Sequence, residues 1–126
     1  MNVVSPFDVN AVIIGKFQAQ PNDPAVAVAH IIAHHGSGNQ WPNQFHPLWN
    51  TQLSNFVTTG FRHSIFVRHS IESGHLIEER RVMFPANFPV GWNSHGLTNT
   101  LTIIYNRAAD TIVTAYPGQY LGYPGI

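Results

Sequence analysis

Two β-rich runs decide the fold of this chain: Leu101-Thr-Ile-Ile-Tyr105 and Thr111-Ile-Val-Thr-Ala-Tyr-Pro117, with a polar turn over 106–110 between them. β-Branched and aromatic residues dominate both runs, so the pattern predicts a β-hairpin. Side chains alternate between the two faces of a strand, and Thr114 and Tyr116 therefore share one face. The last hairpin is thus expected to carry a pair of hydroxyl groups on one side of a sheet.

A second hairpin is predicted directly upstream. The runs His63–Ser70 and His75–Phe84 are typical of strands, and Ser73-Gly74 between them is typical of a tight turn. Pro85 and Pro89 then end the second strand, because proline cannot donate a ladder hydrogen bond, and they open an irregular loop.

The first half of the chain predicts two helices. Residues 25–35 lie between Asp23-Pro24, a capping residue followed by proline, and the stop residue Gly36. This run is apolar nearly all round, so a deeply buried helix is expected. Apolar residues at helical spacing predict a second helix that Pro47 opens and Gly60 stops.

These elements predict an α+β fold in which N-terminal helices pack on a C-terminal antiparallel four-stranded sheet. At 126 residues the chain is expected to form a single domain. Its expected parts are an N-terminal arm (1–22), a helical part (23–60), the antiparallel sheet (61–118) and a tail (119–126).

The composition argues against several classes of function. Only 10% of the residues are charged, which disfavours a protein that coats nucleic acid by long-range attraction. The absence of cysteine rules out disulfides, thiol catalysis and zinc sites built on cysteine. No segment is long and apolar enough for a membrane helix, and the N-terminus lacks a signal-peptide pattern, so no membrane partner is expected.

The histidine-rich segment His30-Ile-Ile-Ala-His34-His35-Gly36 carries the first candidate chemistry. His30 and His34 lie one turn apart on the predicted helix, and imidazole suits both a catalytic base and a metal ligand. The glutamate of the helical metalloprotease motif is missing, so a metal would need a remote third ligand. Histidines that only satisfy local hydrogen bonds are the third interpretation.

The sheet hydroxyls carry the second candidate chemistry. Thr100 and Thr102 share one strand face, as Thr114 and Tyr116 do, so both strands of the last hairpin can present hydroxyl groups away from an apolar face. Such a face suits a phosphate group, although ordinary strand composition also explains the pattern.

Arginine is the cation that binds phosphate through two parallel hydrogen bonds. Arg80 and Arg81 lie on the predicted central strand, and the sequence does not give the register that would choose between them. Arg80 is taken as the catalytic candidate. Arg62 and Arg68 share a predicted strand face and are candidate substrate contacts.

The loop over 92–96 supplies two more candidate substrate contacts, Trp92 and His95. An exposed indole can stack a nucleobase or shape a substrate groove. An equally good interpretation is a connecting loop whose tryptophan closes the edge of the core.

The whole pattern resembles a known group. A helical half with a His-His-Gly segment, followed by an antiparallel sheet that ends in Ile112-Val-Thr-Ala-Tyr-Pro117, resembles the small ribonuclease toxins of the barnase/EndoU/colicin/RelE superfamily. It is also similar to the ribonuclease-A-like C-terminal toxins of contact-dependent inhibition and other polymorphic toxin systems. The resemblance covers residues 24–118. It implies His34 or His35 as the helical histidine.

The resemblance implies an RNA-cleaving toxin delivered into the cytoplasm of a competing bacterium. RNA, with tRNA among the candidates, and a cognate immunity protein would be its partners, and no cofactor or metal is expected. The chemistry would be attack of an RNA 2′-hydroxyl on the adjacent phosphorus, which leaves a 2′,3′-cyclic phosphate. The alternatives are a non-enzymatic binding or structural domain with pH-responsive histidines, and a metal-dependent hydrolase whose metal is held by histidines.

The sequence thus predicts two sets of functional residues. The catalytic set is His34, His35, Arg80, Thr114 and Tyr116, and the substrate contacts are Arg62, Arg68, Trp92, His95 and Thr100.

Overall fold

The computed structural model of the chain describes residues 20–38, 42–72, 74–85 and 90–118. The predicted N-terminal arm lies outside these residues up to position 19, and so do Ser73 and the predicted tail. The helices are α2 (Val28–His35), a short 3₁₀ helix η1 (Pro47–Trp49) and α3 (Leu53–His63). The strands are β1 (Ala25–Val26), β2 (Gln44–Phe45), β3 (Ile65–Glu72), β4 (His75–Met83), β5 (Gly91–Asn93), β6 (Gly96–Thr98), β7 (Thr100–Asn106) and β8 (Thr111–Pro117).

The α+β class is confirmed, and the main sheet differs from the prediction at one edge. Its strand order is β1-β8-β7-β4-β3, and the four long strands pair antiparallel. β1 adds a fifth strand that runs parallel to β8, so the sheet is mixed. A two-residue strand has no sequence signature of its own, because it is held by the backbone of its neighbour.

β1 also moves the start of the first helix. The N–H groups of Ala25 and Ala27 donate to β8, to Asp110 O and Ile112 O, so α2 begins only at Val28. The expected cap, Asp23, instead accepts a hydrogen bond from the N–H of Gln20. The predicted end is confirmed, because Gly36 caps α2.

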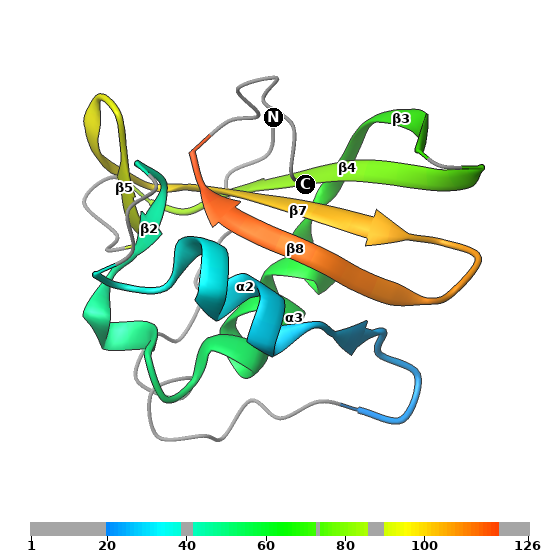
Figure 1. Cartoon of the computed structure of the whole chain (residues 1–126), viewed down its shortest axis with the longest axis horizontal. Helices are drawn as coiled ribbons and strands as arrows, with labels where there is room; N and C mark the ends of the chain where they lie inside the picture. The colour runs from blue at the N-terminus through cyan, green and yellow to red at the C-terminus, as the bar shows by residue number, and fades with distance from the viewer. Residues whose placement is uncertain (1–19, 39–41, 73, 86–89, 119–126) are drawn as a thin grey trace.

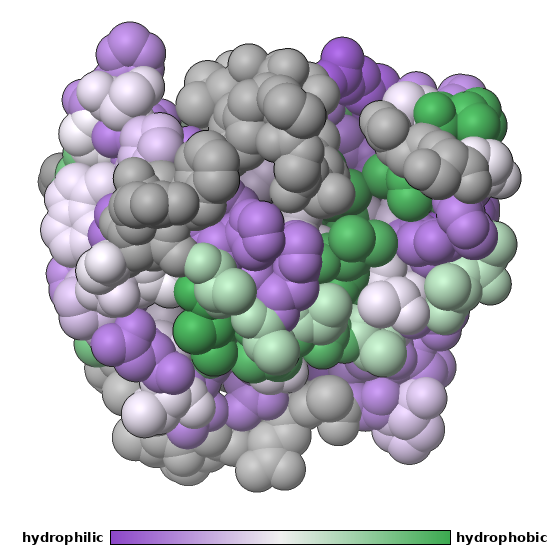
Figure 2. Space-filling view, in the orientation of Figure 1, coloured by the Kyte–Doolittle hydropathy of each residue, from purple (hydrophilic) through white to green (hydrophobic). Residues whose placement is uncertain are grey.

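The helix α2 is less buried than its composition predicts. Only Ile31 and His35 are buried, whereas Ile32 is 47% exposed. Figure 2 shows apolar surface gathered where α2 lies in Figure 1. The helix α2 therefore packs against the rest of the protein through one flank, and its other flank leaves apolar side chains exposed.

The second predicted helix is split and extended. Pro47 opens η1 rather than α3, and α3 then runs past Gly60 to His63. A methyl group at Gly60 would lie 2.8 Å from Leu101 Cδ2 and 3.5 Å from Val82 Cγ1, so this glycine marks the contact of α3 with the sheet rather than a helix stop.

A second, three-stranded sheet is made by β2, β5 and β6. The predicted irregular loop over 91–96 is therefore wrong in part: it forms most of a β5–β6 hairpin, and Gly96 adopts φ +110° in its turn. Strands of two or three residues are too short for an alternating pattern to be recognised in the sequence.

The helix α3 packs against the main sheet at β4 and β7, and α2 lies along β8 (Figure 1). The core between helices and sheet contains the stacked rings of Trp49 and Phe56, whose centroids are 4.0 Å apart. The buried apolar residues of this core are Ile31, Phe45, Trp49, Leu53, Phe56, Val57, Val82, Phe84, Val90, Leu101, Ile103, Ile112 and Ala115. Within the described ranges no helix could cross a membrane, since none is both long and apolar enough.

Gly91 joins the two sheets, and Gly91→Ala is expected to destabilise the fold by about 2–3 kcal/mol. The added methyl would lie 2.2 Å from Gln44 O and 2.6 Å from Pro117 Cγ, and the backbone oxygen cannot move aside without breaking the β2–β5 pairing. Urea unfolding measures the loss. Ser94→Ala in the same hairpin is the control, because Ser94 is exposed, and equal stability of the two variants would contradict the prediction.

Candidate active site on the polar face of the sheet

The register of the main sheet places polar side chains together on one face. Thr102 of β7 lies opposite Arg81 of β4 on one side and opposite Tyr116 of β8 on the other. Directly paired residues point to the same face, and residues two positions apart do so too. We call this surface the polar face; it carries Arg68, Glu79, Arg81, Thr100, Thr102, Thr114 and Tyr116.

The opposite face packs against α3. Its members Val82, Leu101 and Ile103 surround the position where Gly60 of α3 touches the sheet. The polar face is not free of apolar side chains, because Ile104 lies on it between Glu79 and Thr114. A β-bulge between Ile104 and Tyr105 shifts the register of the last hairpin but leaves Thr114 and Tyr116 on the same face.

His35 brings an imidazole to the ring of Tyr116. It is the last residue of α2, which packs against β8, and its ring centroid lies 5.1 Å from that of Tyr116. Its Nδ1 lies 2.9 Å from Asn43 O, and the amide of Asn43 in turn donates to Pro117 O at 2.8 Å. A carbonyl oxygen can only accept, so Nδ1 carries the proton and Nε2 of the neutral ring carries the lone pair.

Burial keeps this imidazole neutral. His35 is 4% exposed, and burial lowers the pKa of its ring from the ordinary 6.5 to about 4, against a smaller raising effect of the hydrogen bond to Asn43. The neighbouring imidazoles of His34 and His30 lower this pKa further. His35 is therefore held as a neutral ring with a fixed tautomer, which is the form a general base needs.

This pKa makes stability depend on pH. The unfolded chain binds the proton of His35 near its ordinary pKa of 6.5 and the folded chain only near 4, so stability is full above 6.5 and falls as the pH drops towards 4. Between pH 7.5 and pH 5 the free energy of unfolding should fall by about 2 kcal/mol. His30, whose pKa is lowered by burial and by His34, adds to the same trend.

Urea unfolding at the two pH values measures this loss. His35→Gln should remove most of it, whereas His75→Gln, at an exposed position, should leave it unchanged. A loss that is as large in His35→Gln as in the parent chain would contradict the assignment to His35.

Charged groups on the polar face are paired around one carboxylate. Glu79 accepts hydrogen bonds from Arg68 Nε at 2.7 Å and from Arg81 Nη2 at 2.5 Å. The Glu79 side chain is 5% exposed and that of Arg81 16%, whereas that of Arg68 is 57% exposed. Sequence reasoning missed Glu79, although its spacing of two from Arg81 places both on one strand face.

The polar face also holds buried hydrogen-bond donors that the described residues do not satisfy. Thr114 Oγ1 and Arg81 Nε are buried and have no hydrogen-bond partner within the described residues. The hydroxyl of Thr102, in contrast, donates to Gly118 O at 2.5 Å. Buried donors without partners are costly in a folded protein, and a functional role is one reason to keep them.

The register separates the two candidate arginines. Arg80 lies on the helix side of the sheet, where its Nε donates to Ser64 Oγ at 2.8 Å and its guanidinium sits 5.1 Å from the Phe61 ring. It also pairs with Glu78 at 3.1 Å. The predicted catalytic residue Arg80 thus does not meet Thr114 and Tyr116, and Arg81 takes its place on their face.

The remaining predicted contacts are spread over the molecule. Arg62 lies near the end of α3 and pairs with Asp23, so it does not share a strand face with Arg68 as predicted. Trp92 is 38% exposed and stacks on His46, with ring centroids 5.1 Å apart. His95 is exposed in the β5–β6 turn, where its N–H donates to Asn93 Oδ1.

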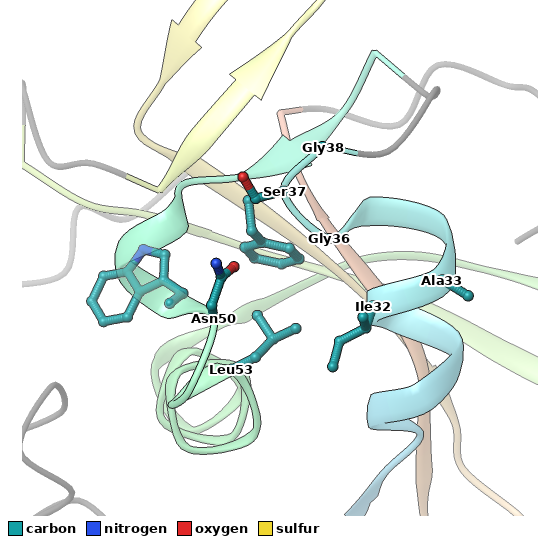
Figure 3. Close-up of a pocket in the computed structure, with 9 residues that line it drawn as sticks. Ile32, Ala33, Gly36, Ser37, Gly38, Asn50 and Leu53 are labelled. Atoms are coloured by element: carbon teal, nitrogen blue, oxygen red, sulfur yellow. The ribbon is translucent and has the colours of Figure 1, made fainter.

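A hollow of the described surface lies elsewhere. A cavity of about 470 Å³ opens beside α2, and Figure 3 shows Ile32 on one side of it and Asn50 and Leu53 on the other. Phe45 and Trp49 also line it, but no predicted catalytic residue does. The His35 ring contacts that of Tyr116 away from this hollow, and Thr114 and Tyr116 are both buried, each 1% exposed.

No family model, curated protein or solved structure matches this chain. The residues described here also contain no group of three or more histidine, aspartate or glutamate side chains placed to hold a metal ion. A metal-dependent hydrolase built on His30 and His34 thus lacks its third ligand among them.

Proposed function

We propose that this protein is a metal-independent endoribonuclease that cleaves RNA through attack of the 2′-hydroxyl and leaves a 2′,3′-cyclic phosphate. One observation carries the proposal: the ring of His35 lies 5.1 Å from that of Tyr116, on a sheet face that also holds Thr114 and Arg81. An imidazole, two hydroxyls and a guanidinium are the groups this reaction needs.

His35 is the general base in this proposal. Its Nε2 takes the proton of the 2′-hydroxyl, while the hydrogen bond from Nδ1 to Asn43 O fixes the ring and stabilises the imidazolium that forms. The attacking oxygen then bonds to phosphorus, and the bond to the 5′-oxygen breaks. His34, whose ring centroid is 6.2 Å from that of His35, donates the proton that the leaving oxygen needs.

Arg81 and Thr114 bind the phosphoryl oxygens. Arg81 Nε and Thr114 Oγ1 are buried donors without a partner within the described residues, and both become satisfied when they donate to an oxyanion. Glu79 holds the Arg81 guanidinium in place and keeps it on this face together with Arg68. Because Thr114 and His35 are buried, RNA reaches them only when the polar face opens.

The biological setting of the proposal comes from the resemblance to polymorphic and contact-dependent inhibition toxins. In that setting the protein is the effector domain delivered into the cytoplasm of a competing bacterium. Its substrate is RNA, with tRNA among the candidates, and a cognate immunity protein blocks it. Exposed Trp92, stacked on His46, offers a flat surface on which an RNA base can stack.

The test is incubation of the protein with tRNA and ribosomal RNA, with and without a chelator, followed by analysis of the product ends. We expect cleavage that the chelator does not affect, and 2′,3′-cyclic phosphate ends. Loss of cleavage in the chelator would support a metal-dependent hydrolase instead, and 5′-phosphate products would exclude the proposed attack.

A non-enzymatic domain is the second candidate function, and burial of the cluster favours it. His35, Thr114 and Tyr116 are all less than 5% exposed, as side chains of a structural core are. In that case no RNA is cleaved, and the histidines act only through the loss of stability at low pH.

A further inference from the structure

We propose that His30 and His34 form a binding site for one divalent transition-metal ion of the zinc, nickel and copper group. The two residues lie one turn apart on α2, and their rings stack with centroids 4.3 Å apart and planes inclined by 23°. Histidines at positions i and i+4 of a helix lie on one face and can bind one ion together, once both rings turn so that a nitrogen of each points at the ion.

The local environment of His30 points to a ligand. Its Nε2 is buried and has no hydrogen-bond partner within the described residues, although a ring nitrogen normally has one. Imidazole nitrogens bind borderline ions well and Mg²⁺ or Ca²⁺ poorly, which sets the class of ion. A bond to a metal would use the His30 nitrogen that the fold leaves without a partner.

The site would be reversible rather than structural. Structural zinc sites close four protein ligands around the ion, whereas no cluster of three or more ligands is found in the part of the chain that the structure describes. Water would fill the remaining positions. Such an ion would fix one flank of α2 directly before His35, without supplying any step of the proposed cleavage.

Titration calorimetry with ZnCl₂ at pH 7.5 tests the proposal on the whole chain. We expect one strong site per chain, no binding of MgCl₂, and an affinity at least about tenfold weaker in His30→Asn and in His34→Asn. His75→Asn, at an exposed position on β4, should bind zinc as the parent chain does. Unchanged zinc affinity in the double variant H30N/H34N would overturn the proposal.

A second measurement separates this result from the ribonuclease proposal, and only this measurement rests on that proposal. Zinc should inhibit RNA cleavage, because its ligand His34 is the proposed acid. His30→Asn should cleave RNA without zinc as the parent does and should resist inhibition. If zinc binds at His30 and His34 but no RNA is cleaved, the metal site stands and the ribonuclease proposal fails. If RNA is cleaved and H30N binds zinc normally, only the metal site fails.

Discussion

Arg81→Gln is expected to reduce RNA cleavage by roughly 10²–10³-fold, the usual effect of removing one donor that stabilises a developing oxyanion. Arg81 lies opposite Thr102 on the polar face, and its Nε is a buried donor without a partner within the described residues. The fold should tolerate the change, because Glu79 keeps its hydrogen bond from Arg68. Single-turnover cleavage of a short RNA at saturating protein measures the loss.

Arg80→Gln is the matched control. Arg80 is the neighbour of Arg81 but faces Phe61 and Ser64 on the helix side of the sheet. Its loss should lower the melting temperature and leave the cleavage rate of the folded protein within about twofold, because its contacts are structural. If Arg80→Gln abolished cleavage while Arg81→Gln did not, the site would lie on the other face and the polar-face assignment would be wrong.

The sequence alone could not decide which of these two arginines shares a face with Thr114 and Tyr116. Alternation within one strand is a local rule, so it correctly placed Thr114 with Tyr116. The choice between Arg80 and Arg81 depends on which residues of β7 lie opposite β4. That register is set by long-range pairing and by bulges, which the sequence of one strand does not contain.

The elements that were predicted are those with a long repeating pattern. The β3–β4 and β7–β8 hairpins and the end of α2 at Gly36 agree with the sequence, because alternation and glycine caps act over neighbouring residues. The shorter β1, β2, β5 and β6 were not predicted. Each has two or three residues and exists only because a partner strand supplies its hydrogen bonds.

The candidate site depends on how the helix and the last hairpin pack, which their sequences do not contain. In the structure the His35 ring reaches Tyr116, while Arg80 lies on the other face of the sheet. The burial of the cluster could not be predicted, because burial is a property of the packed molecule. Glu79 was overlooked because an acidic residue between Glu78 and Arg80 looks like an exposed strand position.

Thr114→Val is expected to have opposite effects on activity and on stability. The hydroxyl of Thr114 is buried and has no hydrogen-bond partner within the described residues, so a methyl group of the same shape should stabilise the fold by about 1 kcal/mol. Cleavage should nevertheless fall by roughly 10–100-fold, because the variant loses a donor to the phosphoryl oxygens. Urea unfolding and single-turnover cleavage of the same sample measure the two effects.

Thr102→Val is the matched control for Thr114→Val. Thr102 is buried on the same face, but its hydroxyl donates to Gly118 O at 2.5 Å, so its loss should destabilise the fold by about 1 kcal/mol. A structural role for the cluster predicts that activity follows stability in both variants. Only a hydroxyl that acts on substrate lowers activity while stability rises, and a Thr114→Val protein that cleaved RNA at the parental rate would remove Thr114 from the reaction.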